Sequence, residues 1–344
     1  MAIEMENDTF IRACRKEEVD HTPIWLMRQA GRYIPEYRKL RENHGIIEIY
    51  KNPEMASDVS AMPIEMFGLD AAIIFQDLMT PLEPAGIKFK LVDSVGPVVS
   101  NPIKSQRDVN GIRLYDTEEL GFVRDEIGML KGKVGVPVIG FAGGPFTIAC
   151  YLIEGLRSKD RDALSAFMKN NNALIVSLMD RIADIVINYL NMQVAAGADA
   201  IQLFDTWSGA LDRQSYSSHV APYVRKIFSS VKGNVPRIYF TLESSHIIDV
   251  IAQSGCDVIS VGWHEELINS WSRINFSMPI QGNMAPGELA RGGEAARNSA
   301  LHILDAVGRR KGHIFNLGHG VLPDTDPMDV KKLVELVHSY STRG

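Results

Sequence analysis

Eight short apolar runs, rich in Val, Ile and Phe, recur along the chain and alternate with longer stretches of helical periodicity. Runs of this kind are typical of parallel strands buried on both faces, and the stretches between them read as crossover helices. The predicted strands are 23–26, 71–76, 137–142, 200–205, 237–242, 257–262, 278–282 and 313–317. The predicted helices are 52–67, 116–130, 158–196, 212–231, 245–254, 265–274, 286–307 and 327–340.

Eight strand–helix units without a break favour a single (β/α)8 barrel over a doubly wound sheet, which usually ends near five or six strands. No low-complexity linker divides the 344 residues, so we expect one domain, 1–344. The stretch 89–102 has Gly96 and Pro97 between two β-branched runs, which predicts a small hairpin inserted after the second strand.

The amino-acid composition limits the cellular compartments and the kinds of partner that we expect for this protein. Lys and Arg total 36 against 42 Asp and Glu, so the net charge of −6 disfavours nucleic acid or an anionic membrane as a partner. Cys14, Cys150 and Cys256 are too widely spaced for a CxxC pair, which fits a reducing compartment. The N-terminus is acidic and lacks the features of a secretory signal, and no apolar run approaches the ~18 residues of a membrane span. We therefore expect a cytoplasmic protein.

Barrels of this class place their reactive residues at the C-terminal ends of the strands, and unusual polar residues do follow these strands. They are Arg28 and Arg32 after the first strand, Asp77 after the second, the glycine turn 140–147 after the third, Thr206 after the fourth, Asn283 after the seventh and His319 after the eighth. In a barrel, these residues would converge on one cleft.

Four arginines, Arg28, Arg32, Arg38 and Arg41, follow the first strand, where Gly31 permits a turn. The planar guanidinium pairs bidentately with carboxylate or phosphate, so several at one mouth predict an anion site. Solvated loop charges are the other interpretation, and it is stronger for Arg38 and Arg41 than for the two arginines next to the strand.

Each of the other candidate site residues has both a functional and a structural interpretation. Asp77 follows an apolar run, so it would stabilise a developing cation or instead cap the next segment. Turn 140–147 offers backbone N–H groups to an anion, with structural glycines as the alternative. Tyr151 and Thr206 are hydrogen-bond donors that could equally be packing residues. His319, between two glycines, is placed to bind an anion or move a proton.

The sequence lacks the motifs that are typical of several other kinds of chemistry. The sequence contains no HxH, HExxH or HxC, so no metal site is predicted, and neither GxGxxG nor GxxxxGK supports nucleotide binding. No lysine stands at a predicted strand end, which argues against a Schiff base, and no GxSxG is present. The residues therefore predict a cofactor-free barrel whose substrate carries several carboxylates or phosphates.

Four segments resemble signatures of the uroporphyrinogen decarboxylase family: 23–38, 70–77, 140–147 and 315–323. The resemblance extends over nearly the whole chain. It implies a single (β/α)8 barrel, a homodimer with facing clefts and no cofactor. It also implies a cytosolic enzyme of haem and porphyrin biosynthesis, which removes the four acetate carboxyl groups of uroporphyrinogen III and its partly decarboxylated intermediates to give coproporphyrinogen III.

The resemblance also implies residue roles. Arg28 and Arg32 would pair with substrate carboxylates, Arg28 being also a candidate proton donor, and Asp77 would accept the pyrrole N–H groups. A pyrrole protonated at its α-carbon takes up the electrons that CO2 leaves behind, and Asp77 would stabilise that cation. The remaining substrate contacts would come from Arg41, Phe141, Tyr151, Thr206 and His319.

The sequence departs from the family pattern at a few places. Ala285 stands where an aspartate is common, 242–245 where a Lys-Gly pair is frequent, and 261–264 where Asp-Trp is usual. These departures concern loops or fine substrate contacts rather than the reaction.

Two other functions are alternatives. A corrinoid-dependent methyltransferase would hold zinc through His-x-Cys and a distant Cys, but neither Cys150 nor Cys256 has a histidine two residues before it. A non-catalytic tetrapyrrole-binding protein would be expected to have lost Arg28, Asp77 or His319, and all three are present.

Overall fold

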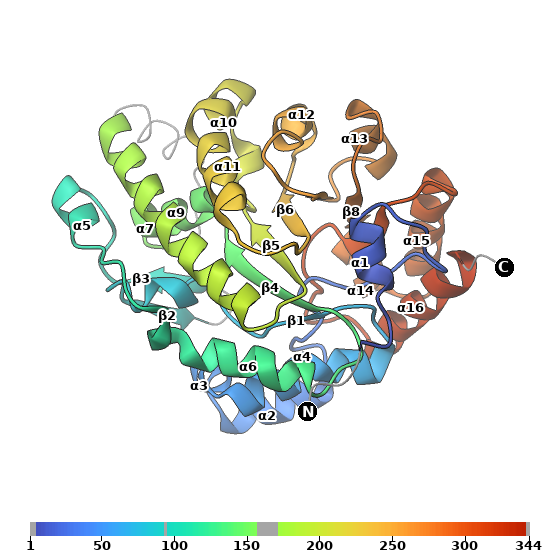
Figure 1. Cartoon of the computed structure of the whole chain (residues 1–344). Helices are drawn as coiled ribbons and strands as arrows, with labels where there is room; N and C mark the ends of the chain where they lie inside the picture. Colours follow the sequence, from blue (N-terminus) through green and yellow to red (C-terminus); the bar gives the residue numbers. More distant parts are fainter. Residues whose placement is uncertain (1–4, 93–94, 157–170, 342–344) are drawn as a thin grey trace.

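The computed structural model describes residues 5–92, 95–156 and 171–341. Its centre is a curled parallel sheet of seven strands in the order β1-β4-β5-β6-β7-β8-β9 (Figure 1). The strands are β1 (Ala72–Ile73), β4 (Val138–Gly143), β5 (Ala200–Phe204), β6 (Arg237–Thr241), β7 (Val258–Val261), β8 (Ile280–Met284) and β9 (His313–Leu317). Each overlaps a predicted strand, so seven of the eight are confirmed.

The first predicted strand, 23–26, makes a single parallel bridge, between Ile24 and Phe315 of β9. The Phe315 N–H donates to the Pro23 carbonyl at 2.8 Å, and on the other side the Asp70 N–H donates to the Ile24 carbonyl at 2.9 Å. Pro23 has no N–H to give to a ladder, and the Leu26 N–H is taken by the side chain of Gln29. The segment therefore lies between the two edges of the sheet without forming a regular strand.

Inward-facing side chains from the strands form a small inner core, which the first helix, α1 (Thr9–Cys14), completes. Phe10 of α1 is fully buried against this core. Its members come from most of the strands and from the segments beside them: Phe10, Ala13, Cys14, Val19, Trp25, Met27, Ala71, Ile139, Ala200, Ile238, Phe240, Val258 and Ile314. A much larger apolar cluster fills the space between the sheet and the outer helices.

Helices cover the outside of the curled sheet (Figure 1). They are α2 (Pro35–Asn43), α3 (Ile46–Lys51), α4 (Pro53–Phe67), α5 (Gln106–Asn110), α6 (Gly121–Lys131), α7 (Pro145–Glu154), α9 (Asn172–Ala195), α10 (Arg213–His219), α11 (Ala221–Ser230), α12 (Ile248–Ile251), α13 (Leu267–Arg273), α14 (Pro286–Arg291), α15 (Gly293–Val307) and α16 (Pro327–Ser341). Short 3-10 turns lie at Thr80–Leu82, Thr117–Leu120, Ser208–Ala210 and Ser245–Ile247.

Two predicted helices, 212–231 and 286–307, are each divided into two. A proline stands in the first turn of α11, where it ends the preceding helix α10. Gly292, at φ 65°, separates α14 from α15 because a left-handed residue cannot continue a right-handed helix. Part of the predicted helix 158–196 lies outside the described residues, and α9 is its described portion.

An antiparallel pair, β2 (Phe89–Val92) and β3 (Gly96–Val99), follows β1, with Phe89 opposite Val99. It packs against α7, since the Val99 N–H donates to the Gly155 carbonyl just after that helix, at 2.6 Å. None of the helices in the described ranges is long and apolar enough to cross a membrane.

Candidate active site

The segment after Ile24 and the segment after β9 form one corner of the molecule. The Val321 N–H donates to the Met27 carbonyl at 2.9 Å, and the Met27 N–H donates to the Asn316 side chain at 3.0 Å. Arg28 stands in this corner with a left-handed backbone, φ 60°, and its side chain is exposed. Two motifs from opposite ends of the sequence thus define the position of Arg28.

Gly320 makes room for the Arg28 side chain. A Cβ atom on Gly320 would lie 2.3 Å from Cδ and 2.7 Å from Cγ of Arg28, well inside van der Waals contact. The glycine after His319 is therefore required for the observed orientation of the arginine, a constraint that the sequence did not reveal.

Asp77 follows β1 and is half-buried. Its Oδ1 accepts the Met79 N–H at 2.9 Å, and its own N–H donates to the Thr80 hydroxyl at 3.2 Å. Burial raises the pKa of Asp77 to about 6, while the Met79 N–H and the positive charge of Arg28 act in the opposite direction. Asp77 and Arg28 are therefore electrostatic neighbours, and Asp77 is mostly ionised at neutral pH.

A buried glutamate that sequence reasoning missed supports the Asp77 loop. Glu126 of α6 is fully buried and accepts the Phe75 N–H at 2.5 Å and the Gln76 amide at 2.6 Å. The same Gln76 amide donates to the Tyr50 carbonyl at 2.9 Å. Burial raises the pKa of Glu126 to about 7. In the sequence, the indication of this buried glutamate was an acidic residue on the apolar face of a predicted helix.

Aromatic rings form a continuous row across the carboxyl ends of the strands. Phe141 contacts Phe204 edge-to-face at 5.5 Å between ring centroids, and Phe204 contacts Phe240 at 5.9 Å. His319 continues the row, 6.3 Å from Phe240 and 6.0 Å from Trp263. The predicted site residues Phe141 and His319 are therefore connected through one row of ring contacts.

Tyr151 and Thr206 lie beside a single turn. The Tyr151 ring packs on Trp207 with 4.7 Å between centroids, and the Thr206 carbonyl accepts the Leu242 N–H at 3.2 Å. A Cβ on Gly96 of β3 would lie 3.9 Å from the Tyr151 hydroxyl, so the β2–β3 pair approaches this side of the site.

Asp205 holds the adjoining glycine turn, residues 140–147, in place. It is fully buried and accepts the Thr147 N–H at 2.7 Å and the Tyr239 hydroxyl at 3.0 Å. Burial raises the pKa of Asp205 to about 6. A Cβ on Gly144 would lie 2.2 Å from that of Asp205, so the glycines here serve close packing, as the alternative interpretation of the turn proposed.

The other arginines differ in their surroundings. Arg32 is exposed in the turn before α2. Arg38 donates to the Arg32 and Tyr33 carbonyls, at 2.9 and 3.0 Å, so its guanidinium has a local structural role. Arg41, near the end of α2, donates to the His44 carbonyl at 2.7 Å.

Known proteins resemble the chain over its full length. A family model described as uroporphyrinogen decarboxylase matches residues 5–340. A uroporphyrinogen decarboxylase of Streptomyces coelicolor is 41% identical over 339 residues, which cover 98% of this chain and 96% of the relative. One of Chloroflexus aurantiacus is 41% identical over 340 residues, or 97% and 96% of the two chains.

Among solved structures, a methyltransferase from Methanosarcina mazei superimposes with a TM-score of 0.83. It is 22% identical, and the match covers 98% of this chain and 99% of the other. A likeness at this identity concerns the fold.

Proposed function

Since this chain belongs to the uroporphyrinogen decarboxylase family, we propose that Asp77 and Arg28 carry out the family's reaction at the carboxyl ends of the strands. The enzyme is a carboxy-lyase that removes the four acetate carboxyl groups of uroporphyrinogen III to give coproporphyrinogen III in porphyrin biosynthesis. The observation that supports the assignment is that Asp77 and Arg28 both follow the carboxyl ends of their strand segments, close enough for the positive charge of Arg28 to lower the pKa of the Asp77 carboxyl.

The substrate supplies its own electron sink. A proton first adds to the α-carbon of a pyrrole, which makes that ring cationic. The bond to the carboxylate then breaks, CO2 leaves, and its electron pair neutralises the ring as an exocyclic methylene. A second proton converts the methylene into methyl, and the α-carbon proton is lost. Asp77, accepting pyrrole N–H bonds, stabilises the cationic ring, so the proposal requires no cofactor.

Arginine has a high reference pKa, which makes Arg28 a weak acid on its own. We assign Arg28 first to the carboxylate of the reacting arm, where its charge also orients a proton donor or a bridging water. Arg32 and Arg41 would bind further carboxylates. Phe141 would pack on the macrocycle, and the polar side chains of Tyr151, Thr206 and His319 would contact its acidic arms.

We also propose that residues 23–26 occupy the position of the eighth strand and so close a (β/α)8 barrel. The support is that this segment hydrogen-bonds to β9 on one side and to Asp70, two residues before β1, on the other. From the family resemblance, we also propose that the protein is a homodimer in the cytoplasm. Sedimentation equilibrium would test the dimer by measuring its mass: twice the mass of one chain is expected, and the mass of a single chain would contradict the proposal.

The reaction is tested by incubating chelator-treated protein with uroporphyrinogen III under anaerobic conditions, oxidising the products and counting their carboxyl groups by chromatography. A progression from eight carboxyl groups to four is expected. The Asp77→Asn protein, prepared in parallel, serves as the control for spontaneous decarboxylation. Unchanged substrate with folded wild-type protein would refute the assignment.

A further inference from the structure

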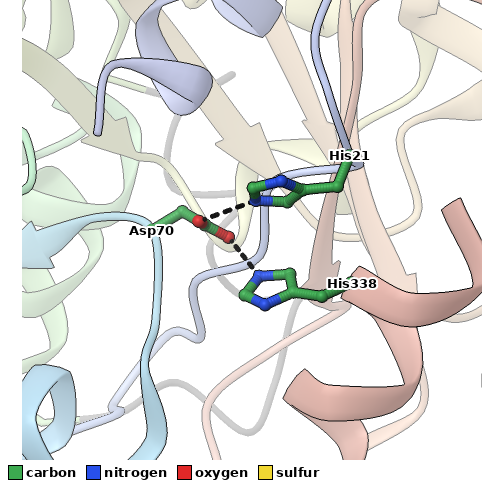
Figure 2. Close-up of side chains that lie close together, drawn as sticks. All are labelled: His21, Asp70 and His338. Atoms are coloured by element: carbon green, nitrogen blue, oxygen red, sulfur yellow. Dashed lines mark hydrogen bonds and ion pairs between the residues drawn. The ribbon is translucent and has the colours of Figure 1, made fainter. Parts of the chain in front are cut away.

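Two histidines and an aspartate meet at the end of the sheet opposite Asp77 and Arg28. His21 precedes the 23–26 segment, Asp70 precedes β1, and His338 projects from α16 (Figure 2). His21 Nε2 lies 3.1 Å from Asp70 Oδ1, and His338 Nε2 lies 2.8 Å from Oδ2. Since the strands of the seven-stranded sheet are parallel, their amino ends share one rim, and this cluster lies away from the proposed reaction.

The orientation of the carboxylate does not depend on the histidines. Asp70 is 1% exposed, and its Oδ1 accepts the Asn7 amide at 2.8 Å while its Oδ2 accepts the Ile24 N–H at 2.7 Å. Each oxygen is therefore held by one donor that is not a histidine and presents its remaining lone pair to an imidazole. Outer donors that fix a carboxylate in this way are typical of metal ligands.

We propose that His21, Asp70 and His338 bind one divalent cation of the zinc class. The ligating atoms of the three residues all lie within 4.8 Å of one another. Two imidazole nitrogens and a carboxylate oxygen suit Zn²⁺, whose tetrahedral ligands are about 3.3 Å apart at bond lengths near 2.0–2.1 Å. The histidine side chains are 21% and 29% exposed, which leaves access for the ion and for a water as fourth ligand.

Ligation requires small movements. The two rings are 4.4 Å apart between centroids and inclined at 61°, so their edges already converge on one carboxylate. A cation would replace two N–H···O contacts by three coordinate bonds and leave the Asn7 and Ile24 hydrogen bonds in place. It would also offset the buried negative charge of Asp70, whose ion-pair partners in the described part of the chain are these two histidines.

The three ligands come from separate parts of the chain, so no local spacing motif could reveal them. A bound ion would link the amino-terminal segment, the start of the sheet and α16 in the folded state. Because the unfolded chain cannot bring these ligands together, binding should raise the melting temperature.

The experiment titrates Zn²⁺ into the chelator-treated full chain by calorimetry and records the melting temperature with and without Zn²⁺. The test variant is His338→Gln, because the glutamine amide can still donate to Asp70 but is a poor ligand. The control is His302→Gln, an exposed histidine of α15 that pairs with Glu266. One equivalent of Zn²⁺ and a rise in melting temperature are expected for the wild type and the control. His338→Gln should lose at least about tenfold in affinity together with the thermal shift.

Equal Zn²⁺ binding by His338→Gln and wild type, or no saturable equivalent in the wild type, would overturn the proposal and leave a hydrogen-bonded cluster. Should the variant not fold, Co²⁺ added to the wild type decides. Visible absorption of tetrahedral cobalt supports the site, and its absence refutes it. Decarboxylation by the metal-free wild type is a separate readout, so failure of this site and failure of the proposed function are distinguishable.

Discussion

At the scale of single residues, Arg28 shows how the site departs from local sequence preferences. A non-glycine residue at φ 60° costs on the order of 1 kcal/mol, which the surrounding hydrogen bonds must offset. Sequence reasoning assigned the turn to Gly31, which does follow the segment. The left-handed residue is the arginine itself, and the glycine that accommodates it, Gly320, lies far away in the sequence. The type of residue was predictable, but its backbone and its neighbour were not.

Gly320→Ala tests this packing. The new methyl group would displace the flexible part of the Arg28 side chain, so we expect kcat/KM to fall by about 100-fold with little change in melting temperature. Gly287→Ala is the matched control, since no atom lies within 4 Å of the place that its new methyl group would occupy, and its activity should be unchanged. Full activity of Gly320→Ala would show that the position of Arg28 does not matter.

Asp77→Asn tests the charge at the second residue. The asparagine oxygen can still accept the Met79 N–H, so the fold should persist, but kcat should fall by about 100-fold or more because an amide cannot stabilise a cationic ring. A variant with nearly wild-type turnover would refute the role of Asp77.

The pKa of Asp77 sets an expected pH dependence. With a pKa of about 6, Asp77 loses its charge as the pH falls below that value, so kcat/KM should decline on the acid side of about pH 6. Substrate N–H groups favour the ionised form, so the decline in kcat should begin at a lower pH. The residual activity of Asp77→Asn should lack this acid limb; the same limb in the variant would assign it to another group.

At the scale of elements, strands were predicted better than helix breaks. Strands buried on both faces form uninterrupted apolar runs, and β9 was predicted with the bounds observed. The 23–26 segment reads the same way, yet its backbone hydrogen bonds depend on Pro23 and on a distant partner, Phe315. Helix α6 carries its buried acidic residue, Glu126, on the face that periodicity assigns to the core, where polar residues are easily dismissed.

Glu126→Gln tests whether α6 positions the Asp77 loop. The amide can accept only one of the two donors from Phe75 and Gln76, which leaves the other without its acceptor. We expect kcat to fall about tenfold with KM nearly unchanged, because a positioning residue does not itself bind substrate. Asp125→Asn, the exposed neighbour on the same helix, is the control. A rise in KM at constant kcat would contradict a positioning role.

At the scale of the whole molecule, the inner core depends on α1. Phe10→Ala removes a fully buried side chain and should lower the free energy of unfolding by about 3–5 kcal/mol. The change lies at the amino-terminal end of the sheet, so kcat should be unaffected when measured well below the melting temperature. Urea unfolding measures the first effect, with Met129→Ala as an exposed control. A loss below about 1 kcal/mol would mean that α1 does not seal this core.

Stability should also depend on pH through Glu126. Its pKa is about 7 in the folded protein, above the ordinary value near 4.3 expected for the unfolded chain. Between these values the folded protein retains a proton that the unfolded chain has lost, so this group makes stability fall as the pH rises from about 4.5 to 7. In Glu126→Gln that decline should be smaller than in the wild type, as measured by urea unfolding at pH 5 and pH 8. An equal decline in both proteins would refute the contribution.

The order of strands predicted which loops meet, and therefore placed Arg28, Asp77 and His319 at one rim. It could not predict contacts that cross the molecule, such as Glu126 beneath the Asp77 loop or His338 beside Asp70. Those contacts depend on how the helices dock on the sheet, which no local pattern encodes.

The corner formed by Met27 and Val321 has a consequence for synthesis on the ribosome. Arg28 emerges early, but the orientation of its side chain requires Gly320, and the Ile24 bridge requires Phe315. A nascent chain can therefore pack several strands and helices during translation, whereas the reaction centre is assembled only after residues 313–321 have left the exit tunnel. Activity should appear abruptly at the end of synthesis, and chains released before that point should have none.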